Sequence, residues 1–276
     1  VYINCLNSKF KIKGDSAKEY PQIPDVNEDK LYSIPQDVLK SMIKQTVFAT
    51  SQDQTKPILM GELLEIENGN INLVAIDGYR FAVRSCQVDN LIHEDLKAKI
   101  IIPGKTLIDV NSLLSSEEEV KVGFNEKNAI FIINDTKIVT RLLEGEFIDY
   151  KKLCPREYNS KIKLKTKDLL NSIERASLLS QSEQNNLIKL SIRDSMMAIT
   201  SNNEKGNVYE EVSLSLEGDY LDIAFNSRYL LEGLKNIDCE EIYIEFTTNV
   251  NPCIIKPADG TKYTYLLLPV RISSNN

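Results

Sequence analysis

Residues 34–43, IPQDVLKSMI, form a pattern that returns 131 residues later in residues 166–173, TKDLLNSI. The shift aligns three pairs of residues: Asp37 with Asp168, Leu39 with Leu170 and Ser41 with Ser172. In the first copy the apolar residues recur at the three- and four-residue spacing of one helix face, and Lys40 lies on another face. Each copy therefore predicts an amphipathic helix that follows a short strand, and the pair indicates an internal repeat.

Alternating β-type segments follow the helix in both copies. Residues 62–67 and 70–75 predict two strands joined at Asn68-Gly69, a hairpin turn signal, and their counterparts are residues 187–192 and 196–201. Each copy then continues with a second helix and two more strands: residues 104–110, 120–124 and 129–133, and residues 227–233, 242–246 and 253–255. Since a helix with one apolar face must pack on a sheet, the sequence predicts an α+β fold of repeated units, each with two helices on antiparallel sheets.

Residues 1–26 do not begin a unit, but they match the end of one. Residues 10–14, FKIKG, alternate like a strand, and residues 19–21 stand where residues 146–148 close the next unit. The simplest organisation is a C-terminal remnant of a first unit at 1–26, a second unit at 27–157 and a third at 158–276. Because the chain begins with Val1, we expect a fragment that lacks most of its first unit.

The charge balance limits the kind of partner. With 33 basic and 40 acidic residues the formal charge is −7, which excludes a generally basic nucleic-acid-binding surface but not a local basic lining. Basic residues recur on the outward faces of the four predicted helices: Lys40, Lys44, Lys105, Lys167, Arg175, Arg228 and Lys235. Each alone is typical of a solvated helix face, whereas their recurrence indicates one surface that faces a polyanion.

The sequence offers no catalytic site. The chain has one histidine, which excludes most histidine-dependent triads and every multi-histidine metal site. Residues 103–106, PGKT, imitate the end of a phosphate-binding loop, but Lys99 stands where that motif needs its first glycine. We expect no enzyme activity, no cofactor and no metal. Five dispersed cysteines and the lack of any apolar segment near ~18 residues predict a cytoplasmic protein without a membrane span.

Three segments resemble the bacterial sliding clamps, the beta subunits of DNA polymerase III. Residues 76–83, IDGYRFAV, are similar to the Thr-Asp-Gly-His-Arg-Leu-Ala segment of that family. Residues 141–150, RLLEGEFIDY, resemble its Lys/Arg-Leu-(acid)-Gly-x-Phe-Pro-Asp-Tyr block, and residues 265–272, YLLLPVRI, resemble its Met-Pro-Met-Arg-Leu terminus. The likeness extends over the whole chain in the right order and spacing, and it implies the DNA-clamp fold.

The resemblance also implies a mechanism without catalysis. Clamps of this family are head-to-tail homodimers of three-domain chains that encircle duplex DNA without sequence preference and act as processivity factors. They tether the catalytic subunit of DNA polymerase III, the clamp loader and other proteins that carry a clamp-binding motif. The seven basic residues above would then line the hole. The positions of Leu178 and Leu179 would contribute to the dimer interface, and the ring could not close as usual without a first domain.

Partner peptides of this family dock in a cleft between the second and third domains. By position, the deep apolar part would comprise Leu59, Ile76, Gly78, Tyr79, Arg80, Phe81, Lys152, Leu153, Val250, Leu266, Leu268, Pro269, Val270 and Arg271. The shallower part would use Asn226 and Tyr229. Tyr79 replaces a His of the family and Phe81 a Leu, which affects fine peptide preference. For each apolar member, a place in the buried core remains the other interpretation.

Two other functions stay open at the level of the sequence. The first is a repeat-built, β-rich adaptor that binds peptides and never encloses DNA. Retention on circular DNA that is lost when the DNA is cut would distinguish a clamp from such an adaptor. The second, a hydrolase that uses carboxylates alone, lacks any paired acidic motif.

Overall fold

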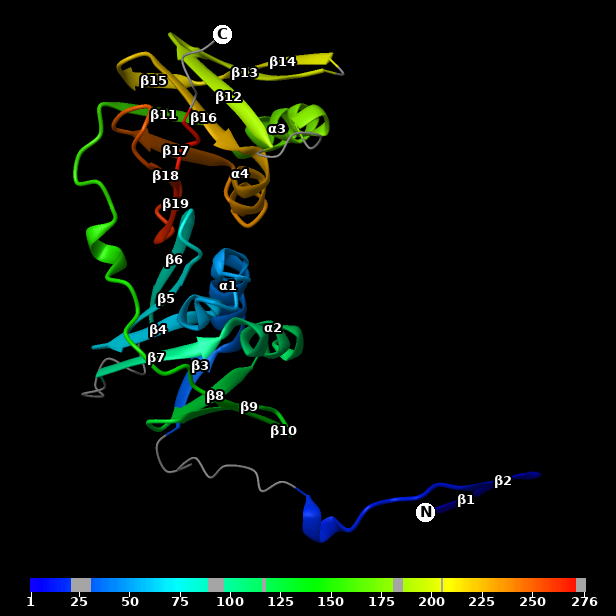
Figure 1. Ribbon diagram of the computed structural model, residues 1–276. Coiled ribbons are helices and arrows are strands. Elements are labelled where there is room, and N and C mark those ends of the chain that lie inside the picture. Colours follow the sequence, from blue (N-terminus) through cyan, green and yellow to red (C-terminus); the bar gives the residue numbers. More distant parts are fainter. Residues whose placement is uncertain (21–30, 89–96, 116–117, 181–185, 205, 272–276) are drawn as a thin grey trace.

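The computed structural model describes residues 1–20, 31–88, 97–115, 118–180, 186–204 and 206–271 (Figure 1). The elements β3 to β10 form what we call the second unit, and β11 to β19 form the third unit. The second unit contains β3 (Tyr32–Pro35), α1 (Gln36–Thr46), η2 (Val47–Ala49), η3 (Pro57–Met60), β4 (Gly61–Glu67), β5 (Asn70–Ile76), β6 (Arg80–Gln87), β7 (Lys97–Pro103), α2 (Gly104–Leu113), β8 (Glu119–Phe124), β9 (Asn128–Ile133) and β10 (Thr136–Arg141).

The third unit repeats this order after a connecting segment that includes η5 (Tyr150–Lys152). It contains β11 (Ser160–Lys165), α3 (Thr166–Ser180), β12 (Leu187–Arg193), β13 (Met196–Asn203), β14 (Gly206–Ser213), β15 (Ser215–Gly218), β16 (Leu221–Asn226), α4 (Ser227–Leu234), β17 (Glu241–Phe246), β18 (Cys253–Pro257) and β19 (Tyr263–Leu267). The helices and strands predicted from the repeat are all present. The structure adds strands that the repeat did not predict, including β6, β7, β10, β14, β15 and β16.

The repeat is confirmed, but the shift of 131 residues is wrong by one for the first helices. Gln36 begins α1 and Thr166 begins α3, a shift of 130 residues. Both amides bind equivalent carbonyls: Gln36 N donates to Glu118 O and Thr166 N to Glu240 O, each at 2.9 Å. Buried Leu39 therefore corresponds to buried Leu169 rather than to Leu170, because the Leu-Leu doublet let the sequence pattern slip by one position.

The strands form antiparallel sheets whose order defines how the units join. Two four-stranded sheets have the orders β10-β9-β8-β3 and β14-β13-β12-β16. The largest sheet has nine strands in the order β15-β11-β17-β18-β19-β6-β5-β4-β7 and crosses from the third unit to the second at β19 and β6. In that pair Tyr265 lies opposite Ala82 and Leu266 opposite Phe81. The predicted α+β class with antiparallel sheets is therefore confirmed.

The nine-stranded sheet is covered on one side by the helices. Figure 1 shows α1 to α4 on the same side of the molecule, with the long sheet along the other side. Each unit has its own apolar core between helices and strands, and the core of the third unit also takes in Ala49, Ala75 and Ala82 from the second. A third cluster lies over the junction and joins residues of both units. The two units therefore share packed apolar surface.

Residues 1–20 form a hairpin of β1 (Tyr2–Cys5) and β2 (Ser8–Lys11) followed by a short 3₁₀ helix, η1 (Ala17–Glu19), and all of them are exposed. Strand β2 covers only part of the predicted strand at residues 10–14, and the expected boundary at residues 26 and 27 lies outside the described residues. None of the described helices is long and apolar enough to cross a membrane.

Candidate functional site

The turn between β5 and β6 is a rigid corner at the junction of the units. The Asp77 Oδ1 atom accepts hydrogen bonds from Tyr79 N at 2.9 Å and Arg80 N at 3.1 Å. Gly78 has φ +97°, a conformation that side chains strongly disfavour. Because the turn is fixed in this way, the Tyr79 side chain projects from it and is 60% exposed.

Arg80 links the two units from beneath this turn. Its guanidinium donates to Asp77 Oδ2 and to Phe48 O, each at 2.9 Å, and pairs with Glu232 Oε2 of the third unit at 2.6 Å. It also lies over the rings of Phe48 and Tyr229, at 5.3 and 4.5 Å from their centres. The side chain is only 5% exposed, so its contacts join the two units and hold the neighbouring surface residues in position.

The charge of Glu232 is stabilised at the junction. Burial would raise the pKa of this carboxyl group, but the hydrogen bond from Arg228 and the positive charge of Arg80 outweigh burial and hold the pKa below its usual value. Arg228 Nε lies 2.8 Å from Glu232 Oε1. The carboxylate is therefore shared between an exposed arginine of its own helix and a buried arginine of the other unit.

An aromatic and apolar surface lies above this ion-pair network. The Tyr79 ring stacks on the Tyr229 ring, with centroids 5.9 Å apart and planes inclined by 22°. Asn226 caps α4 by accepting from Arg228 N and Tyr229 N, and Tyr265 donates its hydroxyl to Tyr229 O at 2.8 Å. These bonds fix the start of α4 next to Tyr79.

The segment after β19 completes this surface. Leu268 N donates to Tyr79 O at 2.9 Å, and Val270 N donates to Ala224 O at 2.8 Å. The structure therefore brings Tyr79, Asn226, Tyr229, Leu268 and Val270 together at the junction.

The apolar residues of the predicted cleft fall into two groups. Leu59, Ile76, Phe81 and Leu266 are buried and pack in the cluster over the junction. These four belong to the buried core at the junction, and we call them its apolar floor. The exposed group is Tyr79, Leu153, Val250 and Leu268. Exposed apolar side chains around a buried apolar floor are typical of a docking surface for apolar side chains.

A hollow of about 470 Å³ opens beside this surface between the two units. Residues of the second unit that line it include Phe48, Lys56 and Asp77, and Glu232 lines it from the third unit. Sequence reasoning did not include these four. No local spacing could identify Glu232, which lies 152 residues from Arg80 on α4, as its partner.

The connecting segment approaches the floor through Tyr150. Its ring lies 6.4 Å from that of Phe81, and its hydroxyl donates to Glu65 Oε2 at 2.6 Å. Burial of the Tyr150 hydroxyl, together with its bond to the Glu65 carboxylate, raises its pKa well above the usual value. Lys152 pairs with Asp149 within its own turn at 2.9 Å, whereas the next residue, Leu153, stays exposed.

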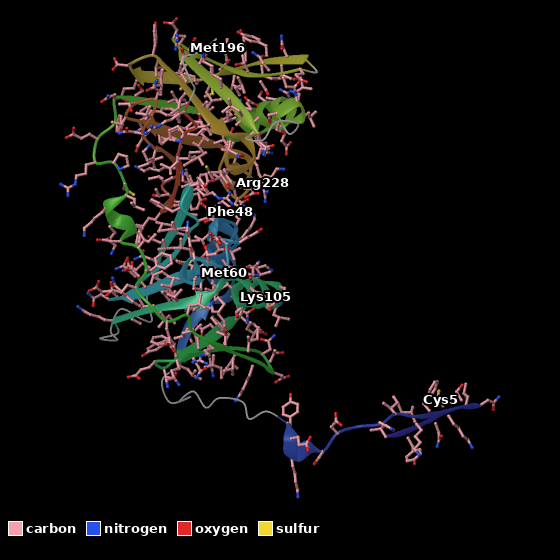
Figure 2. All side chains as sticks on the ribbon, viewed as in Figure 1. Cys5, Phe48, Met60, Lys105, Met196 and Arg228 are labelled. Carbon is pink, nitrogen blue, oxygen red and sulfur yellow. The ribbon has the colours of Figure 1, made fainter. Side chains whose placement is uncertain are left out.

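Most of the basic residues predicted to face DNA already have partners within the chain. Ion pairs join Lys44 to Asp238, Arg175 to Glu210, Arg228 to Glu232 and Lys235 to Glu174. Lys40 donates to Leu114 O at 2.7 Å and so satisfies the end of α2. Within the described residues, Lys105 and Lys167 make no ion pair. Figure 2 shows Lys105 and Arg228 on the side of the molecule that carries the helices.

The predicted interface pair differs in exposure. Leu178, near the end of α3, is 72% exposed, whereas Leu179 is half-buried and its carbonyl accepts a hydrogen bond from Asn203. Among the described residues, no group of His, Cys, Asp or Glu side chains is arranged to hold a metal ion.

Two family models match almost the whole described region of β3 to β19. The model of the DNA polymerase III beta subunit, central domain, matches residues 33–149, and that of its C-terminal domain matches residues 151–271. This chain belongs to the bacterial sliding-clamp family.

Individual relatives agree with this assignment. The chain is 36% identical to the beta sliding clamp of Staphylococcus epidermidis over 98% of this chain and 71% of that protein, and 35% identical to that of Staphylococcus aureus over the same shares. The structure superposes on the DNA polymerase sliding clamp from Bacillus subtilis with a TM-score of 0.94 at 34% identity, covering 99% of this chain and 72% of that one. A clamp from Pseudomonas aeruginosa bound to griselimycin gives a TM-score of 0.91 at 26% identity, covering 98% of this chain and 73% of that one.

The family answers the functional question left open by the sequence. A sliding clamp is a DNA replication protein and a processivity factor of DNA polymerase, and it is not an enzyme. Clamps of this family form homodimeric rings and bind DNA, polymerase and other clamp-binding proteins. The adaptor that never encloses DNA is not favoured.

Proposed function

We propose that this clamp binds partner peptides at the junction between its second and third domains, taken as residues 27–157 and 158–276. The observation that supports this most strongly is the contact between Tyr79 and Leu268. Both side chains are exposed, they belong to different units, and one backbone hydrogen bond holds them together over a buried apolar floor. A short peptide with two or three apolar side chains would bury these groups and leave its ends in water.

Polar groups next to the apolar surface would orient the peptide. Asn226 and Arg271 would supply bonds to its backbone, and the stacked rings of Tyr79 and Tyr229 would form one wall. Arg80 would act by holding this wall in place, because its own guanidinium is buried among protein partners. Lys152 stands at the edge, on the connecting segment, where it would meet only the outer part of a bound chain.

The test is the binding of a fluorescent Gln-Leu-Ser-Leu-Phe peptide to the 276-residue chain, followed by anisotropy. We expect saturable binding that weakens at least tenfold in Tyr79→Ala and in Leu268→Ala. Tyr220→Ala is a matched control, because Tyr220 is 57% exposed on another part of the third unit. Binding that is unchanged by both cleft substitutions, in folded variants, would refute the proposed site.

For the helix side, we propose that Lys105 and Lys167 meet DNA phosphates directly. The other five basic residues would contribute mainly to the local positive electrostatic potential. They are Lys40 and the ion-paired Lys44, Arg175, Arg228 and Lys235. On this proposal the protein works in the cytoplasm, and Leu178 and Leu179 belong to the surface through which the ring is assembled. A clamp assembled from the full-length protein should remain on circular duplex DNA and leave once the DNA is cut, because retention is topological. Loss from intact circles at the same rate would argue against enclosure.

A further inference from the structure

The connecting segment between β10 and β11, residues 142–159, carries two members of the proposed peptide site, Lys152 and Leu153. Its regular structure is the short 3₁₀ helix η5, so no strand ladder fixes its path. Between Leu142 and Ser160, a stretch that the structure describes in full, Tyr150 is the one buried residue. Tyr150 is therefore the point at which the middle of this segment enters the protein.

The Tyr150 side chain contacts two strands of the second unit. Its hydroxyl donates to Glu65 Oε2 on β4 at 2.6 Å. Its ring meets the ring of Phe81 on β6 edge-on, with centroids 6.4 Å apart and planes inclined by 67°. Since Phe81 belongs to the apolar floor, Tyr150 joins the connecting segment to the sheet next to that floor.

The acceptor of this hydrogen bond is an ionised carboxylate. Lys99 Nζ lies 2.9 Å from Glu65 Oε1, and Lys151 Nζ lies 3.6 Å from Oε2. Burial would raise the pKa of Glu65, but the hydrogen bonds from Tyr150 and Lys99 and the charge of Lys151 outweigh burial and hold the pKa below its usual value. A hydrogen bond to an ionised acceptor is stronger than one between neutral groups.

Packing alone does not fix the position of Tyr150. A hollow of about 490 Å³ lies against it and is also lined by Leu63, Ile101 and Phe147. Close packing on all sides holds a core side chain in one place, and here one side is not filled by protein. The bond between the Tyr150 hydroxyl and Glu65 therefore supplies part of the constraint that packing supplies elsewhere.

Tyr150 and Leu153 belong to one turn. Leu153 N donates to Tyr150 O at 3.0 Å, and Lys152 N donates to Asp149 O at 3.2 Å. The Lys152 side chain also pairs with Asp149, at 2.9 Å. Because these bonds close η5, the position of Tyr150 determines that of Leu153, whose side chain is exposed.

We propose that Tyr150 is a positioning residue for peptide binding, an inference that rests on the peptide site proposed above. Its hydrogen bond to Glu65 holds the turn that carries Leu153, so that Leu153 lies at the edge of the apolar floor before a peptide arrives. A peptide that meets a fixed wall does not have to order the segment, a cost that would otherwise reduce the affinity. Tyr150 is buried and acts without touching the peptide.

The first test removes the hydroxyl and keeps the ring. Titration of the 276-residue chain with the fluorescent Gln-Leu-Ser-Leu-Phe peptide should show an affinity about threefold to tenfold weaker for Tyr150→Phe than for the parent chain. Tyr158→Phe is a matched control, because it makes the same change on the same segment at an exposed ring. It should bind like the parent chain. Circular dichroism confirms that each variant is folded.

The second test changes the acceptor. Glu65→Gln keeps a side-chain oxygen that can accept from Tyr150, and it should bind the peptide like the parent chain. Glu65→Leu has no acceptor and should match Tyr150→Phe. Both variants remove the same carboxylate charge, so the difference between them isolates the hydrogen bond. Glu65→Leu also tests the proposal should Tyr150→Phe fail to fold.

A double-mutant cycle separates positioning from a general loss of stability. If Tyr150 acts through Leu153, adding Tyr150→Phe to Leu153→Ala should weaken binding further by less than about twofold. Added to Val250→Ala, a change at an exposed residue of the third unit, it should have its full effect. Equal effects in the two backgrounds would overturn the proposal, because a general loss of stability does not depend on Leu153.

The outcomes distinguish this role from the peptide site itself. A parent chain that does not bind the peptide, or whose binding survives both Tyr79→Ala and Leu268→Ala, would refute the peptide site and the positioning role with it. A parent chain that binds at that site, together with folded Tyr150→Phe and Glu65→Leu chains that bind equally well, would overturn the positioning role alone.

Discussion

At the scale of single residues, Arg80 contributes more to the junction between the units than its place in a turn would indicate. It joins a backbone carbonyl and a carboxylate of the second unit to a carboxylate of the third, with an aromatic ring on each side. A charge that is buried this completely is tolerated because Nε and Nη2 donate hydrogen bonds and Nη1 forms an ion pair with Glu232. Its loss should therefore affect stability first and peptide binding through the position of Tyr79.

We predict that Arg80→Ala lowers the free energy of unfolding by on the order of 3 kcal/mol, because Asp77 and Glu232 lose a buried partner. Arg228→Ala is the matched control. It removes an exposed arginine that pairs with the same Glu232, and it should cost less than about 1 kcal/mol. Urea unfolding followed by circular dichroism measures both values, since the chain has no Trp. Equal losses in the two variants would contradict the assigned role.

Glu62 is a second residue with an unusual environment. It lies on β4 opposite Ile102, on the face that carries core residues Leu64 and Ile66. It is fully buried, and neither carboxyl oxygen has a hydrogen-bond partner within the described residues. Burial raises the pKa of this carboxyl group to about 8, so at neutral pH it is largely protonated in the folded chain.

The raised pKa of Glu62 makes the stability of the folded chain depend on pH. Unfolding returns the pKa of Glu62 from about 8 to 4.5, so between these values the folded state holds a proton that the unfolded state releases. This group therefore makes the folded state less stable as pH rises from 4.5 to about 8. The Glu62→Gln chain lacks this dependence. We predict that its free energy of unfolding exceeds that of the parent chain by an amount that grows steadily from pH 5 to pH 8. Melting temperatures at several pH values test this; a constant difference would contradict it.

At the scale of elements, α4 is the helix whose position matters most for the junction. It carries Tyr229 and Glu232, and it can approach β19 closely because residue 233 is glycine. A Cβ atom at Gly233 would overlap the Tyr265 ring. Since Tyr265 also holds Tyr229 O, the spacing between α4 and the sheet determines the shape of the aromatic wall.

We predict that Gly233→Ala destabilises the chain by about 1–3 kcal/mol through overpacking, although alanine favours a helix over glycine by about 1 kcal/mol. It should also weaken peptide binding, because displaced α4 moves Tyr229 away from Tyr79. Ser112→Ala, at an exposed position of α2, is the control for helix propensity and should be nearly neutral. Thermal unfolding and the peptide titration provide the two readouts. A stabilised Gly233→Ala chain would show that the contact is soft.

The elements were largely predictable from the sequence, and the exceptions have physical reasons. Long amphipathic patterns such as that of α1 specify a helix, because only a helix places all of the apolar residues of the pattern on one face. The alignment of α3 slipped by one residue because Leu169 and Leu170 offer two equivalent apolar positions and only packing selects between them. Strand β15 was missed because its four residues are too few to show a period.

At the scale of the whole molecule, the two units are joined by several kinds of contact. They share the β6–β19 ladder, the packing of Ala75 and Ala82 in the core of the third unit, and the ion pairs of Arg80 and Lys44. The candidate site lies where these features meet. Family resemblance suggested its apolar members, which remain a prediction. It could not suggest Phe48 and Glu232, since their contacts join segments that are far apart in the sequence.

We predict a single calorimetric unfolding transition for the 276-residue chain. Residues 158–276 produced alone should melt several degrees lower, because β19 loses its partner strand and Tyr265 loses the cover of Phe48. Two separate transitions in the parent chain, or an unchanged melting temperature in the isolated unit, would contradict this view of the junction.

The junction also has a mechanical consequence. The nine-stranded sheet continues from one unit to the next at the β6–β19 ladder (Figure 1). Ion pairs from Arg80 to Glu232 and from Lys44 to Asp238 also join the two units. A change in the angle between the units would strain these ion pairs and the contact between the Phe48 and Tyr265 rings. The junction should therefore resist bending and hold the two units at one preferred angle.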